Sequence, residues 1–228
     1  MRKQIFITLV ALIGTVFCVE GAVEDYVLPA NHPLQKKLSG LFNQVRFDNR
    51  LAARDGGFLP IPRIHRGMMV MNHPNVPGYL FKKFYDSKLS SKKEEQNFIR
   101  RIEGARRLKA LIAEKKLKHI VAPEKWLYRL PDQDRYILVV EKVNLLKDKK
   151  TKERYGTISK EVLQELCIVL NHMRGLDSVI PNMPFTKDDK IAFIDTERWA
   201  ENRPDFLHHA KHYLSDKDRK YAESLKNF

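Results

Sequence analysis

The order in which hydrophobic patterns follow one another constrains the fold of this sequence more than any other feature. Two short apolar runs, near 64–71 and 78–85, flank the turn-forming stretch "NHPNVP", which predicts two strands joined by a tight connection. A long helix is predicted next, beginning near Ser90. Its apolar residues recur at helical spacing: Phe98, Ile102, Ala105, Leu108, Leu111 and Ile112.

The second half of the sequence continues with strands and then helices. Two strand-like runs at 119–130 and 135–146 flank the turn "PDQD", and a second amphipathic helix is predicted at 159–175. The charged stretch "KDKKTKERYG" between them predicts a linker. A loop and strand follow at 177–197, and the chain ends in one or two charged helices. This order indicates an α+β fold with segregated layers rather than an alternating βαβ sheet.

The N-terminus has the pattern of a secretory signal peptide. Arg2 and Lys3 precede an apolar run that ends near Cys18, which predicts a signal at 1–21. The run is short for a membrane span, so an uncleaved anchor is the alternative that we do not favour. We expect a secreted or lumenal chain with no transmembrane span after cleavage. Cys167 would then have no disulfide partner, so packing must stabilise the fold.

The net charge of +14 is concentrated in the middle of the chain. Between Lys82 and Lys118 there are thirteen Lys or Arg residues and five Asp or Glu residues. Such a region attracts phosphates, nucleic acid or acidic lipid headgroups, and it is equally typical of a solvated surface. We do not expect nucleic acid there, because Trp126, Tyr128 and Tyr136 alternate like packed strand residues rather than forming a stacking platform.

Oxygen-bearing side chains lie at both ends of the strand predicted within "DSVIPNMPFTKDDKIAFIDTE". Asn182 is on the Pro-rich loop before it, and Asp195 follows an apolar triplet. Amide and carboxylate oxygens are ligands that Mg²⁺ accepts in proteins. The stretch therefore predicts either a divalent-cation site between Asn182 and Asp195, or only a turn followed by a strand.

From about Met69 to Trp199 the order of these residues resembles the protein-kinase-like superfamily. In that family a strand lysine contacts the nucleotide phosphates, and a glutamate on the following helix pairs with it. "GYLFKK", followed by Glu103 in "FIRRIEGARRL", resembles that pair. Lys82 and Lys83 compete for the role, and since they point to opposite faces of the strand only one can take it. We prefer Lys82, which directly follows the apolar "YLF".

The resemblance continues through the later motifs. "LVVEKVN" looks like the hinge that binds adenine, which implies contacts to ATP from three residues: Val140, Glu141 and Val143. "DSVIPN" has the family's spacing between the catalytic-loop aspartate and the metal-binding asparagine, so Asp177 is the implied base. "FIDTE" resembles the second metal motif, which implies that Asn182 and Asp195 hold Mg²⁺.

The resemblance implies a compact two-lobed fold with an arm and short helix at 22–62, an N-lobe at 63–146 and a reduced C-lobe at 147–228. No glycine-rich phosphate loop is evident, and only about thirty residues follow "FIDTE". Three functions stay open. The first is a secreted domain that binds ATP and Mg²⁺ and transfers phosphate to an unidentified acceptor. The second is an inactive pseudokinase-like interaction module, in which Asp177 is a turn residue and the basic region binds an acidic protein. The third is a basic protein that binds polyanions or membrane surfaces.

Overall fold

The structure is a computed structural model that describes residues 22–225, except for 44, 46, 48, 62–66, 86–89, 132, 202–206 and 208. The predicted signal peptide at 1–21 lies outside the described residues. So does the first part of the strand predicted near 64–71. Within the described part, none of the helices combines the length and the apolar character that a membrane crossing needs.

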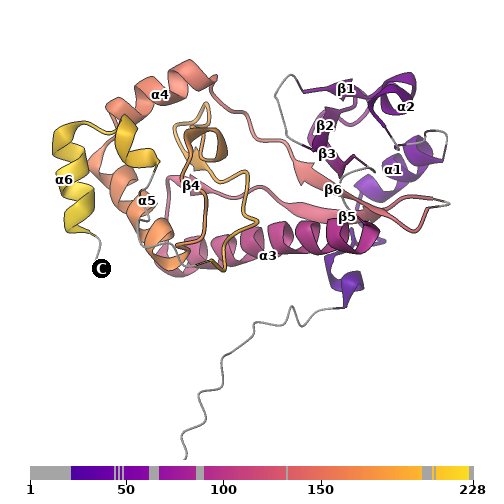
Figure 1. Cartoon of the computed structure of the whole chain (residues 1–228), viewed down its shortest axis with the longest axis horizontal. Helices are drawn as coiled ribbons and strands as arrows, with labels where there is room; N and C mark the ends of the chain where they lie inside the picture. Colours follow the sequence, from indigo (N-terminus) through magenta and orange to yellow (C-terminus); the bar gives the residue numbers. More distant parts are fainter. Residues whose placement is uncertain are drawn as a thin grey trace, which may run out of the picture.

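Four of the predicted strands and one short strand that was not predicted, β1, form a five-stranded antiparallel sheet (Figure 1). In spatial order the strands are β1 (Leu59–Pro60), β2 (Met68–Asn72), β3 (Tyr79–Phe84), β6 (Tyr136–Glu141) and β5 (Lys125–Arg129). The long helix α3 (Ser91–Lys115) is inserted between β3 and the second pair of long strands, as its hydrophobic period predicted. The α+β class with an antiparallel sheet is therefore confirmed.

The register of β2 and β3 decides which lysine faces which side of the sheet. Lys82 lies opposite Val70, and Lys83 lies opposite Met69. Side chains alternate between the two faces along a strand. Val70 belongs to the core that includes Phe98 of α3, so Lys82 is on the α3 side of the sheet and Lys83 is on the other side.

The side of the sheet opposite α3 is covered by the N-terminal part of the chain. Helices α1 (Leu34–Phe42) and α2 (Arg50–Asp55) form a core there that is rich in aromatic rings. The short helix predicted within 22–62 is present as α1. The segment predicted as an arm before it is packed against the protein, because Tyr26 and Leu28 are buried.

The remaining helices surround a third core at the far end of α3 (Figure 1). They are α4 (Asp148–Gly156), α5 (Lys160–His172) and α6 (Asp216–Ser224). The same part of the protein contains a small parallel pair of strands, β4 (Ile120–Val121) and β7 (Ile191–Ala192). Helix α5 begins after Ser159, whose hydroxyl accepts a hydrogen bond from the Val162 N–H at 3.3 Å.

The linker predicted at 147–156 is wrong, because α4 occupies this segment. Its exposed face is highly charged, but Thr151 and Tyr155 are fully buried. The Tyr155 hydroxyl donates a hydrogen bond to the Met183 carbonyl at 2.8 Å. Tertiary contacts of these two residues stabilise a helix that the local charge pattern does not predict.

Helix α3 packs against two of these cores, the one between α3 and the sheet and the one among the helices. Phe98 and Ile102 lie against the sheet, and Leu108 lies in the helical core. Between them, a β-carbon added at Gly104 would be 2.2 Å from the Thr196 carbonyl oxygen. Helix α3 therefore holds the segment around Thr196 at very short range.

Candidate functional site

A cavity of about 370 Å³ lies on the α3 side of the sheet. Leu80 and Lys82 of β3 line it, together with Lys187 before β7 and Ile194 after it. The chain segment 141–145, which follows β6, forms another part of the lining. The cavity is thus lined by several parts of the chain that are distant in the sequence.

All three residues predicted to bind adenine line this cavity: Val140, Glu141 and Val143. Val140 is buried at the end of β6. The Lys142 N–H still donates to the Gly78 carbonyl at 2.8 Å, and the chain then leaves the sheet. Val143 consequently lies in the segment that lines the cavity just after β6.

The structure places Lys82 on the cavity and Lys83 on the opposite side of the sheet. Lys82 lines the cavity and is partly exposed. Lys83 is fully buried on the face that also carries Phe81. Of the two lysines that the sequence left open, Lys82 is the one that a ligand in the cavity can reach.

Asp195 lies next to the cavity residue Ile194, and positive charges surround it. Burial by itself raises the pKa of Asp195, yet this pKa is lowered overall. The lowering is caused by the nearby charges of Arg101, Lys82 and Lys125, together with a hydrogen bond from the Glu197 N–H. The Asp195 carboxylate is therefore ionised at neutral pH and already has cationic neighbours.

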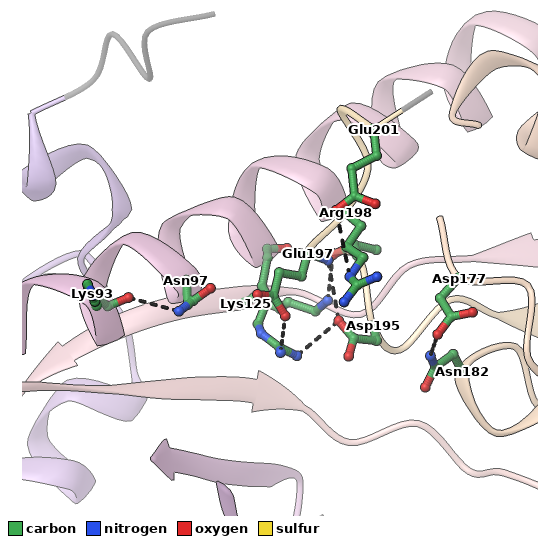
Figure 2. Close-up of polar contacts among 11 residues, drawn as sticks. Lys93, Asn97, Lys125, Asp177, Asn182, Asp195, Glu197, Arg198 and Glu201 are labelled. Atoms are coloured by element: carbon green, nitrogen blue, oxygen red, sulfur yellow. Dashed lines mark hydrogen bonds and ion pairs between the residues drawn. The ribbon is translucent and has the colours of Figure 1, made fainter. Parts of the chain in front are cut away.

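Arg101 of α3 makes the closest of these contacts. Its Nη1 is 2.9 Å from Asp195 Oδ1, and its Nη2 contacts Glu197 Oε2. Figure 2 shows the dashed ion pairs that reach Asp195 and Glu197. We did not predict Arg101 as a site residue from the sequence. A signal was present, since Arg101 lies three residues after Phe98 and four before Ala105, on the apolar stripe of the helix.

A second unpredicted residue, Lys125 of β5, also holds the segment around Thr196 in place. Its Nζ is buried and donates to the Thr196 hydroxyl at 2.8 Å, and that hydroxyl donates to the Arg101 carbonyl at 2.6 Å. Burial lowers the pKa of Lys125 well below its usual value, and the nearby charge of Lys82 lowers it further. Strand β5, helix α3 and the segment at Thr196 are thereby connected by consecutive hydrogen bonds.

Glu103, predicted to pair with Lys82, has a different partner in the structure. Its Oε1 accepts a hydrogen bond of 2.8 Å from the hydroxyl of Tyr26. Burial and this hydrogen bond raise the pKa of Tyr26 to about 12. Residues two apart on a helix face different directions. Arg101, not Glu103, is therefore the α3 residue that faces Asp195.

Asp177 and Asn182 contact each other on the loop that follows α5 (Figure 2). The Asn182 Nδ2 donates to Asp177 Oδ2 at 3.3 Å. The Asn182 carbonyl also accepts a hydrogen bond from the Ile194 N–H at 3.0 Å. The structure thus brings Asp177 and Asn182 close to the segment that carries Asp195.

The arrangement does not fit the predicted Mg²⁺ site. Asp195 can offer its carboxylate to a metal ion only in competition with Arg101, and the same neighbours that lower its pKa would repel a second cation. Among the described residues, no group of three or more His, Cys, Asp or Glu side chains is placed to hold a metal ion. The metal roles of Asn182 and Asp195 stay predictions.

Part of the basic region is used within the protein. Arg106 donates to the Asp25 carbonyl at 2.7 Å, and the Arg107 guanidinium stacks 4.0 Å from the centre of the Trp199 ring. Arg107 and Trp199 border a larger, open cavity of about 510 Å³ between α3 and α5, which contains none of the predicted site residues. The exposed charge of α3 is thus smaller than the sequence count suggests.

A scan of the chain against models of known protein families gives no match, and no curated protein sequence matches it. The function therefore has to be inferred from the cavity and from the charges beside it.

Proposed function

We propose that this chain is a kinase-like domain that binds a nucleotide in the cavity beside β3. The observation that carries the proposal is that residues which the resemblance assigns to phosphates and to adenine line one cavity. Lys82 and Val143 are sixty-one positions apart in the sequence and line the same cavity, which continues to Ile194 beside Asp195. A nucleotide with its base near Val143 and its phosphates near Lys82 would contact both sets of predicted residues.

The chemistry of the lining supports an anionic ligand with a flat apolar part. Val70, Leu80 and Val140 offer apolar surface for a base. The charged residues that line the cavity are three lysines and one glutamate: Lys82, Lys142, Lys187 and Glu141. This excess of positive charge favours a phosphorylated ligand over a neutral nucleoside.

The finer fold is part of the same proposal. A five-stranded antiparallel sheet with α3 inserted after β3 is the arrangement expected for the N-lobe at 63–146, and α4 to α6 would then form a reduced C-lobe at 147–228. Secretion, proposed from the pattern at 1–21, would place this domain in a secretory lumen or outside the cell.

A binding module without phosphoryl transfer is the candidate that the contacts of Asp195 favour. In a phosphotransferase of this class the second-motif aspartate binds the metal ion on the phosphates. Here Arg101 already bonds that carboxylate, and Asp177 bonds Asn182. The remaining exposed charge on α3, including Arg100 and Lys93, would bind an acidic protein partner.

Thermal unfolding with added ATP, with and without Mg²⁺, tests nucleotide binding. A ligand at one hundred times its dissociation constant adds about 2.7 kcal/mol to the free energy of unfolding, which raises the Tm by several degrees. We expect ATP to raise the Tm more than adenosine does. Lys82→Met should remove most of the difference between the Tm shifts with ATP and with adenosine. The matched variant Lys150→Met, at an exposed position of α4, should retain that difference. An unchanged Tm at millimolar ATP in all conditions would exclude the proposal.

A further inference from the structure

We infer that this cavity binds nucleotide phosphates through the lysines of its lining and without Mg²⁺, because the Arg101 guanidinium beside the cavity already neutralises Asp195. The inference rests on the proposed nucleotide binding and goes beyond it. It names the form of the ligand, a metal-free polyphosphate, and it assigns a role to a buried arginine that was not among the predicted site residues.

The position of Arg101 is fixed by its surroundings. Only 9% of its side chain is exposed, and its guanidinium bonds two carboxylates, Asp195 and Glu197. Its own carbonyl accepts the Thr196 hydroxyl, and the nearby Gly104 leaves no room for a β-carbon against Thr196. Helix α3 therefore cannot withdraw Arg101 from Asp195 without breaking several contacts at once.

The local charges are unsuitable for a divalent cation. Three cationic groups, Lys82, Lys125 and Arg101, face two carboxylates, Asp195 and Glu197. If burial keeps Lys125 neutral, the charges of these five groups balance, and in neither state do the five groups together carry a net negative charge that would attract Mg²⁺. Magnesium also needs near-octahedral oxygen ligands, and Asp195 already gives one of its two oxygens to Arg101.

The same charges suit a phosphate group. The Lys82 ammonium lines the cavity itself, and Lys187 and Lys142 lie along its wall. Ammonium and guanidinium groups donate charge-assisted hydrogen bonds to phosphate oxygens, and a site with its own cations needs no metal to neutralise the phosphates. A ligand that carries Mg²⁺ on its phosphates would bring a second positive group towards Arg101.

The test is calorimetric titration of the full chain with ATP, once in EDTA and once with Mg²⁺. We expect the affinity in EDTA to be equal to or greater than that with Mg²⁺. Binding that is at least tenfold weaker in EDTA would overturn the inference and leave nucleotide binding intact. Absence of binding under both conditions would instead exclude the proposed function, and the inference with it.

Two variants separate the role of Arg101 from a purely structural one. Arg101→Gln should weaken ATP in EDTA at least tenfold, and Mg²⁺ should restore part of the affinity because Asp195 becomes available to the metal. If that variant does not fold, Asp195→Asn decides. Without a metal, removal of the negative charge beside the phosphates should tighten ATP binding. If folded Asp195→Asn, confirmed by its unfolding curve, instead loses an affinity for ATP that the wild type shows only with Mg²⁺, Asp195 is a metal ligand and the inference is overturned.

Discussion

Arg101 on α3 and Asp195 after β7 are ninety-four positions apart in the sequence and form an ion pair of 2.9 Å. The arginine side chain is almost fully buried, whereas about a third of the aspartate side chain is exposed. The pair therefore joins the long helix to the end of the candidate cavity. A ligand that approaches Asp195 from the cavity meets a carboxylate that is already neutralised.

Arg101→Met should destabilise the protein, because it leaves two partly buried carboxylates, Asp195 and Glu197, without their shared cation. The loss should be about 2 kcal/mol, between the values for exposed and for fully buried ion pairs. Urea unfolding at pH 7 measures it. Arg129→Met is the control, since its pair with Asp134 is exposed. Equal effects of the two substitutions would mean that the Arg101 contacts contribute little.

Gly104→Ala should destabilise the fold by about 1–3 kcal/mol, the usual cost of overpacking. Its new methyl group would collide with the Thr196 carbonyl, which is backbone and cannot turn away. Gly40→Ala in α1 is the matched control, because no atom lies within 4 Å of a β-carbon there. It should stabilise the helix by about 0.5–1 kcal/mol. Thermal unfolding of the two variants should therefore shift the Tm in opposite directions.

Tyr26→Phe removes the hydrogen bond to Glu103 and should cost about 1 kcal/mol at pH 7. The folded-state pKa of Tyr26 is raised to about 12, above the unfolded value near 10. The stabilisation is thus complete below pH 10 and is lost as the pH rises from 10 towards 12. Unfolding curves of wild type and variant should converge over that range. A constant difference up to pH 11 would contradict the Tyr26 contact.

Lys125→Met should stabilise the protein at neutral pH. The folded-state pKa of Lys125 is far below its unfolded value near 10.5, so folding must release a proton or bury a charge. The free energy of unfolding of the wild type should therefore rise with pH up to about 10.5, while the variant lacks this slope. The difference in free energy of unfolding between the variant and the wild type should therefore become smaller as the pH rises towards 10.5. If the stability of the wild type depends on pH no more than that of the variant, Lys125 is not desolvated.

Much of the fold could be predicted because its elements have strong local periods. The helix at α3, the strands β3 and β6 and the helix α5 were all visible as apolar patterns. The helix α4 was not, because what stabilises it is the burial of Thr151 and Tyr155 against distant residues. Packing of Tyr26 onto α3 was also invisible, since a long-range hydrogen bond leaves no local pattern.

The candidate site divides in the same way. Lys82, Val140 and Val143 followed from motifs and strand alternation, and the structure places them on one cavity. The partners of the charged groups did not follow. Glu103 bonds Tyr26, and Arg101 bonds Asp195. The position of each residue around the helix axis of α3 decides which of them faces the site. Spacing between motifs gives the order of residues along the chain but not the angle at which a helix presents them.

The most direct measurement is a calorimetric titration of ATP into the wild-type chain and into Leu80→Trp. The tryptophan would fill the cavity from β3, at a partly exposed position where it need not disturb the core. We predict one ATP site in the wild type and none in folded Leu80→Trp, with the Tm of the free variant within a few degrees of wild type. Binding of ATP to Leu80→Trp with wild-type affinity, or no ATP binding by the wild type, would contradict nucleotide binding in this cavity.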